Sequence, residues 1–184
     1  LKSNDIECDF VKIAGNTRIN VKLNDTDINA AGPDISDDEF QRLYKKLDNL
    51  KSGDFLVLSG SVPKCLPQNT YEIILERLKN KGIYFVVDAE KQLLLNTLRY
   101  KPFLIKPNHH EIAEMFNVKI STTEELIHYG NQLKEMGAQN VLISMGGDGA
   151  ILIAENGTVY RSNVPKGVVK NSVGAGDSMV AGFV

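Results

Sequence analysis

The chain has 184 residues, of which 42% are apolar and 24% are charged, with a formal net charge of −2. This composition is typical of a globular domain, and the lack of a basic surplus argues against nucleic acid as the main partner. No apolar run approaches the roughly 18 residues that a membrane-spanning helix requires, so we expect no membrane partner.

The first 32 residues have the pattern of short antiparallel strands. In FVKIAGNTRINVKL, side chains alternate on both sides of Gly15-Asn16, which is typical of a half-exposed hairpin. TDINAAG then reads as a further extended piece. We expect residues 1–32 to form a small β flap; an edge ribbon of the main sheet fits the pattern equally well.

From Ser36 the pattern changes to alternating helices and strands, and we assign residues 33–184 to an α/β core. Ser36-Asp37-Asp38-Glu39 predicts a capping box at the start of a helix. The spacing of apolar residues then predicts one buried stripe, formed by Phe40, Leu43, Leu47 and Leu50. FLVLSG, which follows, is typical of a strand covered on both faces.

The alternation continues through the rest of the core. We expect helices over 69–81, 90–98, 108–116 and 122–136, with Gly82 and Gly137 ending the first and the last of them. IYFVVDA, FLIKPN and NVLISMGG predict strands, and AILIAENGTVYR predicts a hairpin whose type I′ turn is Asn156-Gly157. SMVAGFV predicts a final helix without a polar end, and the chain begins with Leu1, so we expect that residues are missing at both ends.

Strands that alternate with helices predict a mostly parallel sheet with helices on both faces. In such sheets, ligands bind beyond the carboxyl ends of the strands. Polar or glycine-rich segments follow the expected strands directly, at Ser59-Gly60-Ser61, Asp88, Lys106-Pro107-Asn108 and 144–149. The sequence therefore predicts a ligand site at that edge of the sheet.

The segment NSVGAGDSM combines a glycine-rich turn with one carboxylate. Gly174 and Gly176 allow the backbone to point N–H groups inward, and the helix that begins near Asp177 adds its positive end, so we expect an anion-binding hollow. A carboxylate there suits a base that takes a proton from a hydroxyl group as a phosphoryl group arrives. The alternative is that Asp177 only complements the helix dipole. The patterns GxxxxGK[ST] and GxGxxG are both absent.

Six motifs, in order, resemble those of the ribokinase-like carbohydrate kinases of the phosphofructokinase B type: TRINVKL, INAAGP, LSGSVP, KPNHHEI, SMGGDGA and GAGD. The first two are most similar to the branch of 1-phosphofructokinases. The resemblance implies a three-layer α/β sandwich with a β flap, and transfer of the ATP γ-phosphoryl group to fructose 1-phosphate to give fructose 1,6-bisphosphate. The alternatives are a tagatose-6-phosphate kinase and a catalytically silent nucleotide- or sugar-binding module of the same fold.

The resemblance also implies roles for individual residues. Asp177 matches the catalytic base, and the N–H groups of Gly174, Ala175 and Gly176 match the anion hole. Arg18 matches a flap arginine that holds the existing phosphate of the substrate, and Ser61 matches a substrate-side position. Matches to nucleotide-binding positions are Lys106, Asn108, Ser144, Gly146, Gly147 and Gly149.

The resemblance further implies Mg²⁺ as a cofactor and ATP as a co-substrate. Glu111 matches the acid of an N-x-x-E motif linked to magnesium, although Asn108-x-x-Glu111 is also a good capping box. Flaps in this family often pair between subunits, which implies a homodimer. Cys8 and Cys65 form no CxxC pair, so we expect reduced thiols and a cytoplasmic location.

Overall fold

The computed structural model describes residues 4, 6–23, 26–30, 32–169 and 172–184. They fall into two compact units, one formed by Leu1–Leu50 with Val62–Thr70 and the other by Lys51–Ser61 with Tyr71–Val184. The boundary predicted between residues 32 and 33 stays a prediction. In the described residues, no helix has both the length and the apolar character that crossing a membrane would need.

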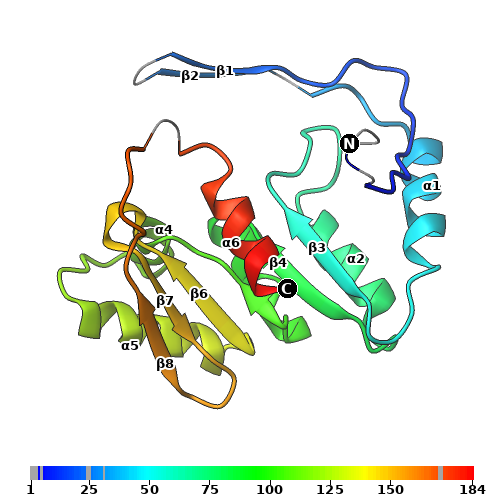
Figure 1. Cartoon of the computed structure of the whole chain (residues 1–184). Coiled ribbons are helices and arrows are strands. Elements are labelled where there is room, and N and C mark those ends of the chain that lie inside the picture. The colour runs from blue at the N-terminus through cyan, green and yellow to red at the C-terminus, as the bar shows by residue number, and fades with distance from the viewer. Residues whose placement is uncertain (1–3, 5, 24–25, 31, 170–171) are drawn as a thin grey trace. The chain divides into compact units, whose positions relative to one another are not determined.

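The first unit contains a flap of two antiparallel strands, β1 (Asn20–Leu23) and β2 (Thr26–Asn29), with Val21 opposite Ile28. The flap is a sheet of its own and not a ribbon of the larger one (Figure 1). The hairpin predicted around Gly15-Asn16 is wrong, because no strand forms over residues 10–17. There the Ala14 N–H donates to the carboxylate of Glu39 at 2.9 Å.

Helix α1 (Asp37–Leu47) also belongs to the first unit and begins at the predicted capping box. The Ser36 hydroxyl accepts from the Glu39 N–H, and the Glu39 carboxylate accepts from the Ser36 N–H. These hydrogen bonds from Ser36 and Ala14 lower the pKa of Glu39. The predicted apolar stripe is only half-buried; the buried side chains of the helix are those of Glu39 and Tyr44.

The second unit is built on a six-stranded sheet in the order β3-β4-β5-β6-β7-β8. Strands β3 to β6 run parallel and β7 and β8 antiparallel, so the predicted mostly parallel sheet is confirmed. The strands are β3 (Phe55–Ser59), β4 (Tyr84–Asp88), β5 (Leu104–Ile105), β6 (Asn140–Ser144), β7 (Ala150–Ile153) and β8 (Val159–Ser162).

Helices cover this sheet on both faces, as expected for a three-layer α/β fold. Figure 1 shows α6 on the near face and α2, α4 and α5 on the far face. The helices are α2 (Thr70–Leu78), α3 (Lys91–Leu95), α4 (His109–Phe116), α5 (Thr123–Glu135) and α6 (Ala175–Phe183), with 3₁₀ turns η2 (Leu98–Tyr100) and η3 (Gly146–Asp148).

Alternation along the strands divides the core between the two faces. Leu142 points to one side, where Val180 of α6 packs in a cluster with Val86 and Leu104. Its neighbour Ile143 points to the other side and contacts α5. Helix α5 approaches so closely at Gly130 that an added Cβ would lie 2.4 Å from the Ile153 side chain.

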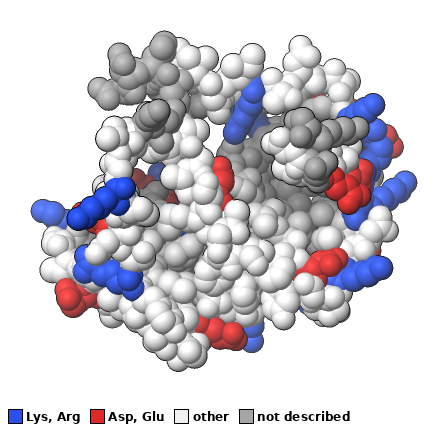
Figure 2. All heavy atoms as spheres, viewed as in Figure 1, with Lys and Arg blue, Asp and Glu red and all other residues white. Residues whose placement is uncertain are grey.

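The expectation that FLVLSG is covered on both faces is wrong. Phe55 and Val57 of β3 are 39% and 45% exposed, whereas Leu58 is buried. Beside them, the ring of Tyr84 stacks on the ring of Phe55, and the ring of Phe103 packs edge-on against both. The reason is that β3 is the edge strand, and α6 packs on the more central strands. Figure 2 shows few charged side chains around α6 in this view.

The β7–β8 hairpin forms as predicted, but its turn is not type I′. That turn requires positive φ at both central residues, and only Gly157 has it, at 82°. Instead the Gly157 N–H donates to the Ala154 carbonyl, and the Ala154 N–H donates to the Thr158 carbonyl. The Asn156 side chain accepts a hydrogen bond from the Thr158 N–H at 2.9 Å, which favours a turn without positive φ at Asn156.

Candidate active site

The segments that follow β3 to β6 meet at one edge of the sheet, as predicted. The Gly60 N–H donates to the Asp88 carbonyl at 2.9 Å, and the Ser144 N–H donates to the Pro107 carbonyl at 3.1 Å. Asn108 and Ser144 also pair as an isolated parallel bridge. These contacts connect the loop after β3 to the end of β4, and the loop after β5 to the end of β6. Ser61 lies exposed beyond the end of β3.

The residue with the most consequential position at this edge is Lys106. Its ammonium lies 3.1 Å from a carboxylate oxygen of Asp88, with side chains only 10% and 19% exposed. The same ammonium lies close to the start of α6, since a Cβ added to Gly176 would be 3.1 Å from Nζ. Lys106 thus joins the ends of β4 and β5 to the glycine-rich turn.

The glycine-rich turn opens α6 in the predicted way. Gly174 is the N-cap residue and has a left-handed backbone, with φ of 80°. Gly176 and Asp177 lie in the first helical turn, where N–H groups have no acceptor within the helix. The Ala175 N–H donates to the Ser172 carbonyl at 3.2 Å. The Ala175 N–H, which the resemblance assigns to the anion hole, is therefore already paired, whereas the N–H groups of Gly176 and Asp177 have no acceptor within the helix. The Asp177 side chain is exposed.

Helix α4 begins at the capping box formed by Asn108 and Glu111. The Asn108 side chain accepts from the Glu111 N–H at 2.8 Å, and the Glu111 carboxylate accepts from the Asn108 N–H at 2.7 Å. Burial raises the pKa of Glu111, against the opposing effects of the Asn108 hydrogen bond and the Lys106 charge. The charges of Glu90 and Asp88 add to the rise.

The donor set at this edge fits Mg²⁺ better than a metal held by protein alone. Magnesium keeps several waters and binds through one or two carboxylates together with substrate phosphates. Glu111 and Asp88 are carboxylates, and Asp88 is near enough for its charge to help raise the pKa of Glu111. Within the described ranges, no group of three or more His, Cys, Asp or Glu side chains could hold a metal.

The loop after β6 is held in shape by its own backbone and by β8. The Met145 N–H donates to the Gly149 carbonyl at 2.9 Å. Gly149 has φ of 91°, and a Cβ there would lie 2.0 Å from the Ser162 carbonyl oxygen. Gly149 is thus required by packing against the strand. A Cβ on Gly146 or Gly147 would meet no atom within 4 Å, so these two leave space for a ligand.

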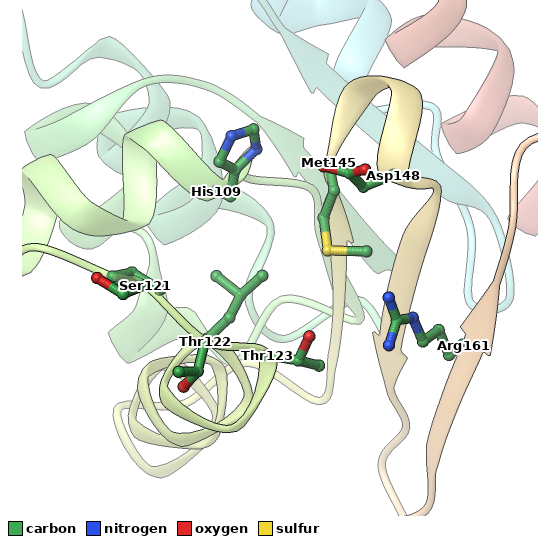
Figure 3. A pocket seen from close by; sticks show the side chains of 9 residues that line it. His109, Ser121, Thr122, Thr123, Met145, Asp148 and Arg161 are labelled. Carbon is green, nitrogen blue, oxygen red and sulfur yellow. The ribbon is translucent and has the colours of Figure 1, made fainter.

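A pocket of about 190 Å³ lies on the other side of this loop. Figure 3 shows His109, Thr122, Met145, Asp148 and Arg161 around it, from α4, α5, the loop and β8. Leu126 of α5 lines it too, so the pocket is on the sheet face opposite α6. It is therefore separate from the predicted phosphate hollow, although both use the loop after β6.

The structure brings most of the predicted residues to one place, and it adds one that the sequence did not single out. Lys106, Asn108, Glu111, Ser144 and the turn at Gly176 lie around the ends of adjacent elements. Arg18 is exposed and belongs to the other compact unit. The sequence identifies Asp88 only as a strand-end residue. The sequence feature that could have pointed to Asp88 is that two successive strands end in opposite charges, Asp88 and Lys106.

Comparisons with known proteins agree with this architecture. The profile of the pfkB family carbohydrate kinases matches residues 1–184. The 1-phosphofructokinase of Bacillus subtilis (strain 168) is 48% identical over 187 residues, which is 100% of this chain and 61% of that protein. The D-tagatose-1-phosphate kinase of Bacillus licheniformis is 38% identical over 188 residues, 100% of this chain and 62% of the relative. The chain thus spans about three fifths of the length of these relatives.

The solved structures include phosphofructokinase-2 from Escherichia coli in complex with fructose-6-phosphate. Its TM-score is 0.74 at 26% identity, and the match covers 89% of this chain and 54% of that one. Another structure of the same enzyme is described as its tetrameric inhibited form.

Proposed function

Because the chain belongs to the pfkB family of carbohydrate kinases, we propose that the full-length protein transfers the γ-phosphoryl group of ATP to fructose 1-phosphate. The product would be fructose 1,6-bisphosphate. The observation that carries the proposal is the position of Lys106, whose ammonium lies beside Gly176 at the positive start of α6. A buried cation and helix amides at one point suit the charge of a transferred phosphoryl group.

The reaction would be a single in-line displacement. The sugar hydroxyl oxygen forms a bond to the γ-phosphorus while the bond from that phosphorus to the β–γ bridging oxygen breaks. The hydroxyl proton passes to the carboxylate of Asp177, and ADP leaves with the electron pair of the broken bond. The exposure of Asp177 in the first turn of α6 supports its access to a substrate. The amides of Gly176 and Asp177 and the Lys106 ammonium offset the charge of the phosphoryl oxygens.

The nucleotide would lie along the loops after β5 and β6. Asn108 and Ser144 are paired there, and the space over Gly146 and Gly147 supports a close approach of the nucleotide. Glu111, with Asp88 nearby, would hold Mg²⁺ through bound water, as the donor chemistry allows. The cation would supply further neutralisation of the phosphate charges when bound.

The first test is Asp177→Asn in the full-length protein, with ADP release followed in a coupled assay. Loss of the base should lower kcat by roughly 10²–10⁴-fold, with little change in the KM for ATP. Because the side chain is exposed, the Tm should be unchanged. Unaltered turnover would remove Asp177 from the reaction. If the unmodified protein binds ATP and sugar phosphate but shows no turnover, it is a silent module of the fold.

The sugar phosphate is the finer part of the proposal. Sequence identity supports fructose 1-phosphate over tagatose 1-phosphate, given the names of the two relatives. Rates should be compared on these two substrates and on fructose 6-phosphate and tagatose 6-phosphate. The highest kcat/KM is expected for fructose 1-phosphate, and a higher value for another sugar phosphate would reassign the substrate.

Arg18 on the flap segment is proposed to hold the phosphate that the sugar already carries. A guanidinium group pairs with phosphate in two-point geometry and so fixes its direction. Arg18→Ala should raise the KM for the sugar phosphate at least tenfold and leave the KM for ATP unchanged, corresponding to the loss of about 1.5 kcal/mol or more from a charged hydrogen bond. Arg18→Lys should restore part of the binding. A change confined to the KM for ATP would exclude this role.

We also propose a homodimer formed through the flap and a cytoplasmic location. The flap exposes Ile19, Val21 and Ile28, which supports pairing with a second copy. Cys8 and Cys65 are both free thiols, which is usual in a reducing compartment.

A further inference from the structure

The mechanism proposed above uses Lys106 and Asp88 separately and gives no role to the ion pair that they form with each other. The two residues follow paired positions on adjacent parallel strands, Val87 of β4 and Ile105 of β5. Their charged atoms are 3.1 Å apart, and both side chains are largely buried. The exposed ion pair between Lys91 and Glu114, with side chains 60% and 55% exposed, is a useful contrast. Exposed pairs contribute little, whereas a buried charge without a partner is costly.

The position of the Lys106 ammonium needs a physical explanation. It lies at the N-terminal end of α6, where the helix dipole is positive and disfavours a cation. It is also almost excluded from water. The Asp88 carboxylate forms an ion pair with Lys106, and Glu111 adds a more distant negative charge. Without Asp88, the field of the helix and the gain in hydration would both draw the ammonium away from the turn.

We infer that Asp88 is a positioning residue: its carboxylate holds the Lys106 ammonium against Gly176, in place for the phosphoryl group before the nucleotide binds. The inference rests on the proposed function for its catalytic consequence, but the held position itself is a property of the protein alone. Such preorganisation matters because a cation that is already placed need not reorganise as the transition state forms.

A double-mutant cycle in the full-length protein tests the inference. The variants are Asp88→Asn, Lys106→Met and the two combined, assayed for kcat and for the KM of ATP at saturating Mg²⁺. Lys106→Met should lower kcat by roughly 10²-fold or more, and Asp88→Asn by about tenfold. The double variant should be no slower than Lys106→Met, because a residue that acts only through Lys106 has no further effect without it.

Three further variants serve as controls for the cycle. Glu114→Gln removes the exposed ion pair on α4 and should leave kcat within about twofold of the unmodified protein. Lys106→Gln, which can still hydrogen-bond to Asp88, replaces Lys106→Met in the cycle if the methionine variant does not fold. Asp88→Glu keeps the charge and should recover part of the kcat that Asp88→Asn loses.

A second measurement does not depend on turnover. The protein without ligands is treated with acetic anhydride, and acetylation of Lys106 is followed by peptide mass spectrometry. Acetylation should be slow in the unmodified protein and several-fold faster in Asp88→Asn, while the labelling of Lys91 stays the same. If the protein phosphorylates no sugar phosphate, the proposed function fails, and this labelling still decides whether Asp88 holds Lys106.

Two results would overturn the inference. One is an equal loss of kcat from Asp88→Asn in the presence and in the absence of Lys106. The other is unchanged labelling of Lys106 in Asp88→Asn, with a higher Mg²⁺ requirement in both backgrounds. The second result would assign Asp88 to the magnesium ion instead.

Discussion

Gly174 and Gly176 stand on either side of Ala175, but the structure requires glycine at the two positions for different reasons. Gly174 has φ of 80°, a conformation in which a side chain is strained. A Cβ at that position would otherwise meet open space. Gly176 does not have a positive φ, but there is little room for a side chain at this position. Lys106 Nζ and Cε would lie 3.1 and 3.4 Å from an added Cβ. Gly174 is therefore required by the backbone conformation of the turn, and Gly176 by the position of the Lys106 side chain.

This difference predicts opposite effects for two alanine substitutions. Gly176→Ala should keep or raise the Tm, since alanine is favoured over glycine in a helix by up to about 1 kcal/mol. It should nevertheless lower kcat about tenfold, because the methyl group displaces the ammonium. Gly174→Ala should lower the stability by roughly 1–2 kcal/mol through backbone strain. Thermal melting and the coupled assay on both variants test this, and a fall in Tm for Gly176→Ala without loss of turnover would contradict it.

At the same scale, Asp88 shows what a single sequence leaves out. An acid at a strand end has many uses, and its partner lies 18 positions further along the chain. Only the pairing of β4 with β5 makes Asp88 and Lys106 neighbours. By contrast, Lys106, Asn108 and Glu111 belong to one short motif, so their proximity follows from sequence spacing.

Among the elements, α4 carries one carboxyl group, that of Glu111, which caps the helix and is also proposed to hold Mg²⁺. Glu111 closes the capping box with Asn108, and burial raises its pKa. A raised pKa in the folded protein means that the folded state holds the proton to higher pH than the unfolded state does. The contribution of Glu111 to stability is then present below its unfolded pKa and is lost as pH rises through its folded pKa.

Glu111→Gln separates these uses. Glutamine retains the capping hydrogen bond and has no charge to bury. Without Mg²⁺ and ATP, the variant should therefore gain Tm relative to the unmodified protein as pH rises through the carboxylate range towards neutrality. With both ligands at neutral pH the order should reverse, because only the carboxylate supports the cation. Melting curves over pH with and without ligands test this; a variant that is equally stabilised by Mg²⁺ and ATP would exclude Glu111 from the metal site.

The elements that were predicted correctly are those set by local chemistry. The capping boxes at Ser36, Asn108 and Thr122 each begin a helix at the expected residue. The errors in the flap and in the burial of β3 have tertiary causes. The Ala14 N–H donates to the Glu39 carboxylate and so is not available to a strand at that position. The strands of the flap pair further along the chain than predicted. The exposure of β3 depends on which strands α6 covers, and an apolar run cannot reveal that.

At the scale of the whole molecule, the proposed reaction needs residues from both compact units. Arg18 belongs to the first, and Asp177, Lys106 and Ser61 belong to the second. The edge of the sheet in the second unit carries its own ordered contacts, so we propose that nucleotide binding there does not need the flap.

The flap itself leads to the prediction about assembly. Val21 and Ile28 are directly opposed across β1 and β2, so they share one face, and Ile19 lies just before β1. They are 41%, 54% and 72% exposed. Fully burying a side chain of this kind contributes about 1.5–3 kcal/mol, so covering this face with that of a second copy would favour a dimer.

Val21→Lys in the full-length protein should therefore convert a dimer to a monomer at micromolar concentration, as measured by sedimentation velocity. A lysine places a charge within the paired face and disfavours its burial. Val168→Lys is the matched control, because Val168 is 92% exposed and lies in the other unit, outside the flap. That variant should sediment as the unmodified protein does. A Val21→Lys protein that remains dimeric would mean that the subunits associate through another surface, and the exposed face of the flap would then need a different explanation.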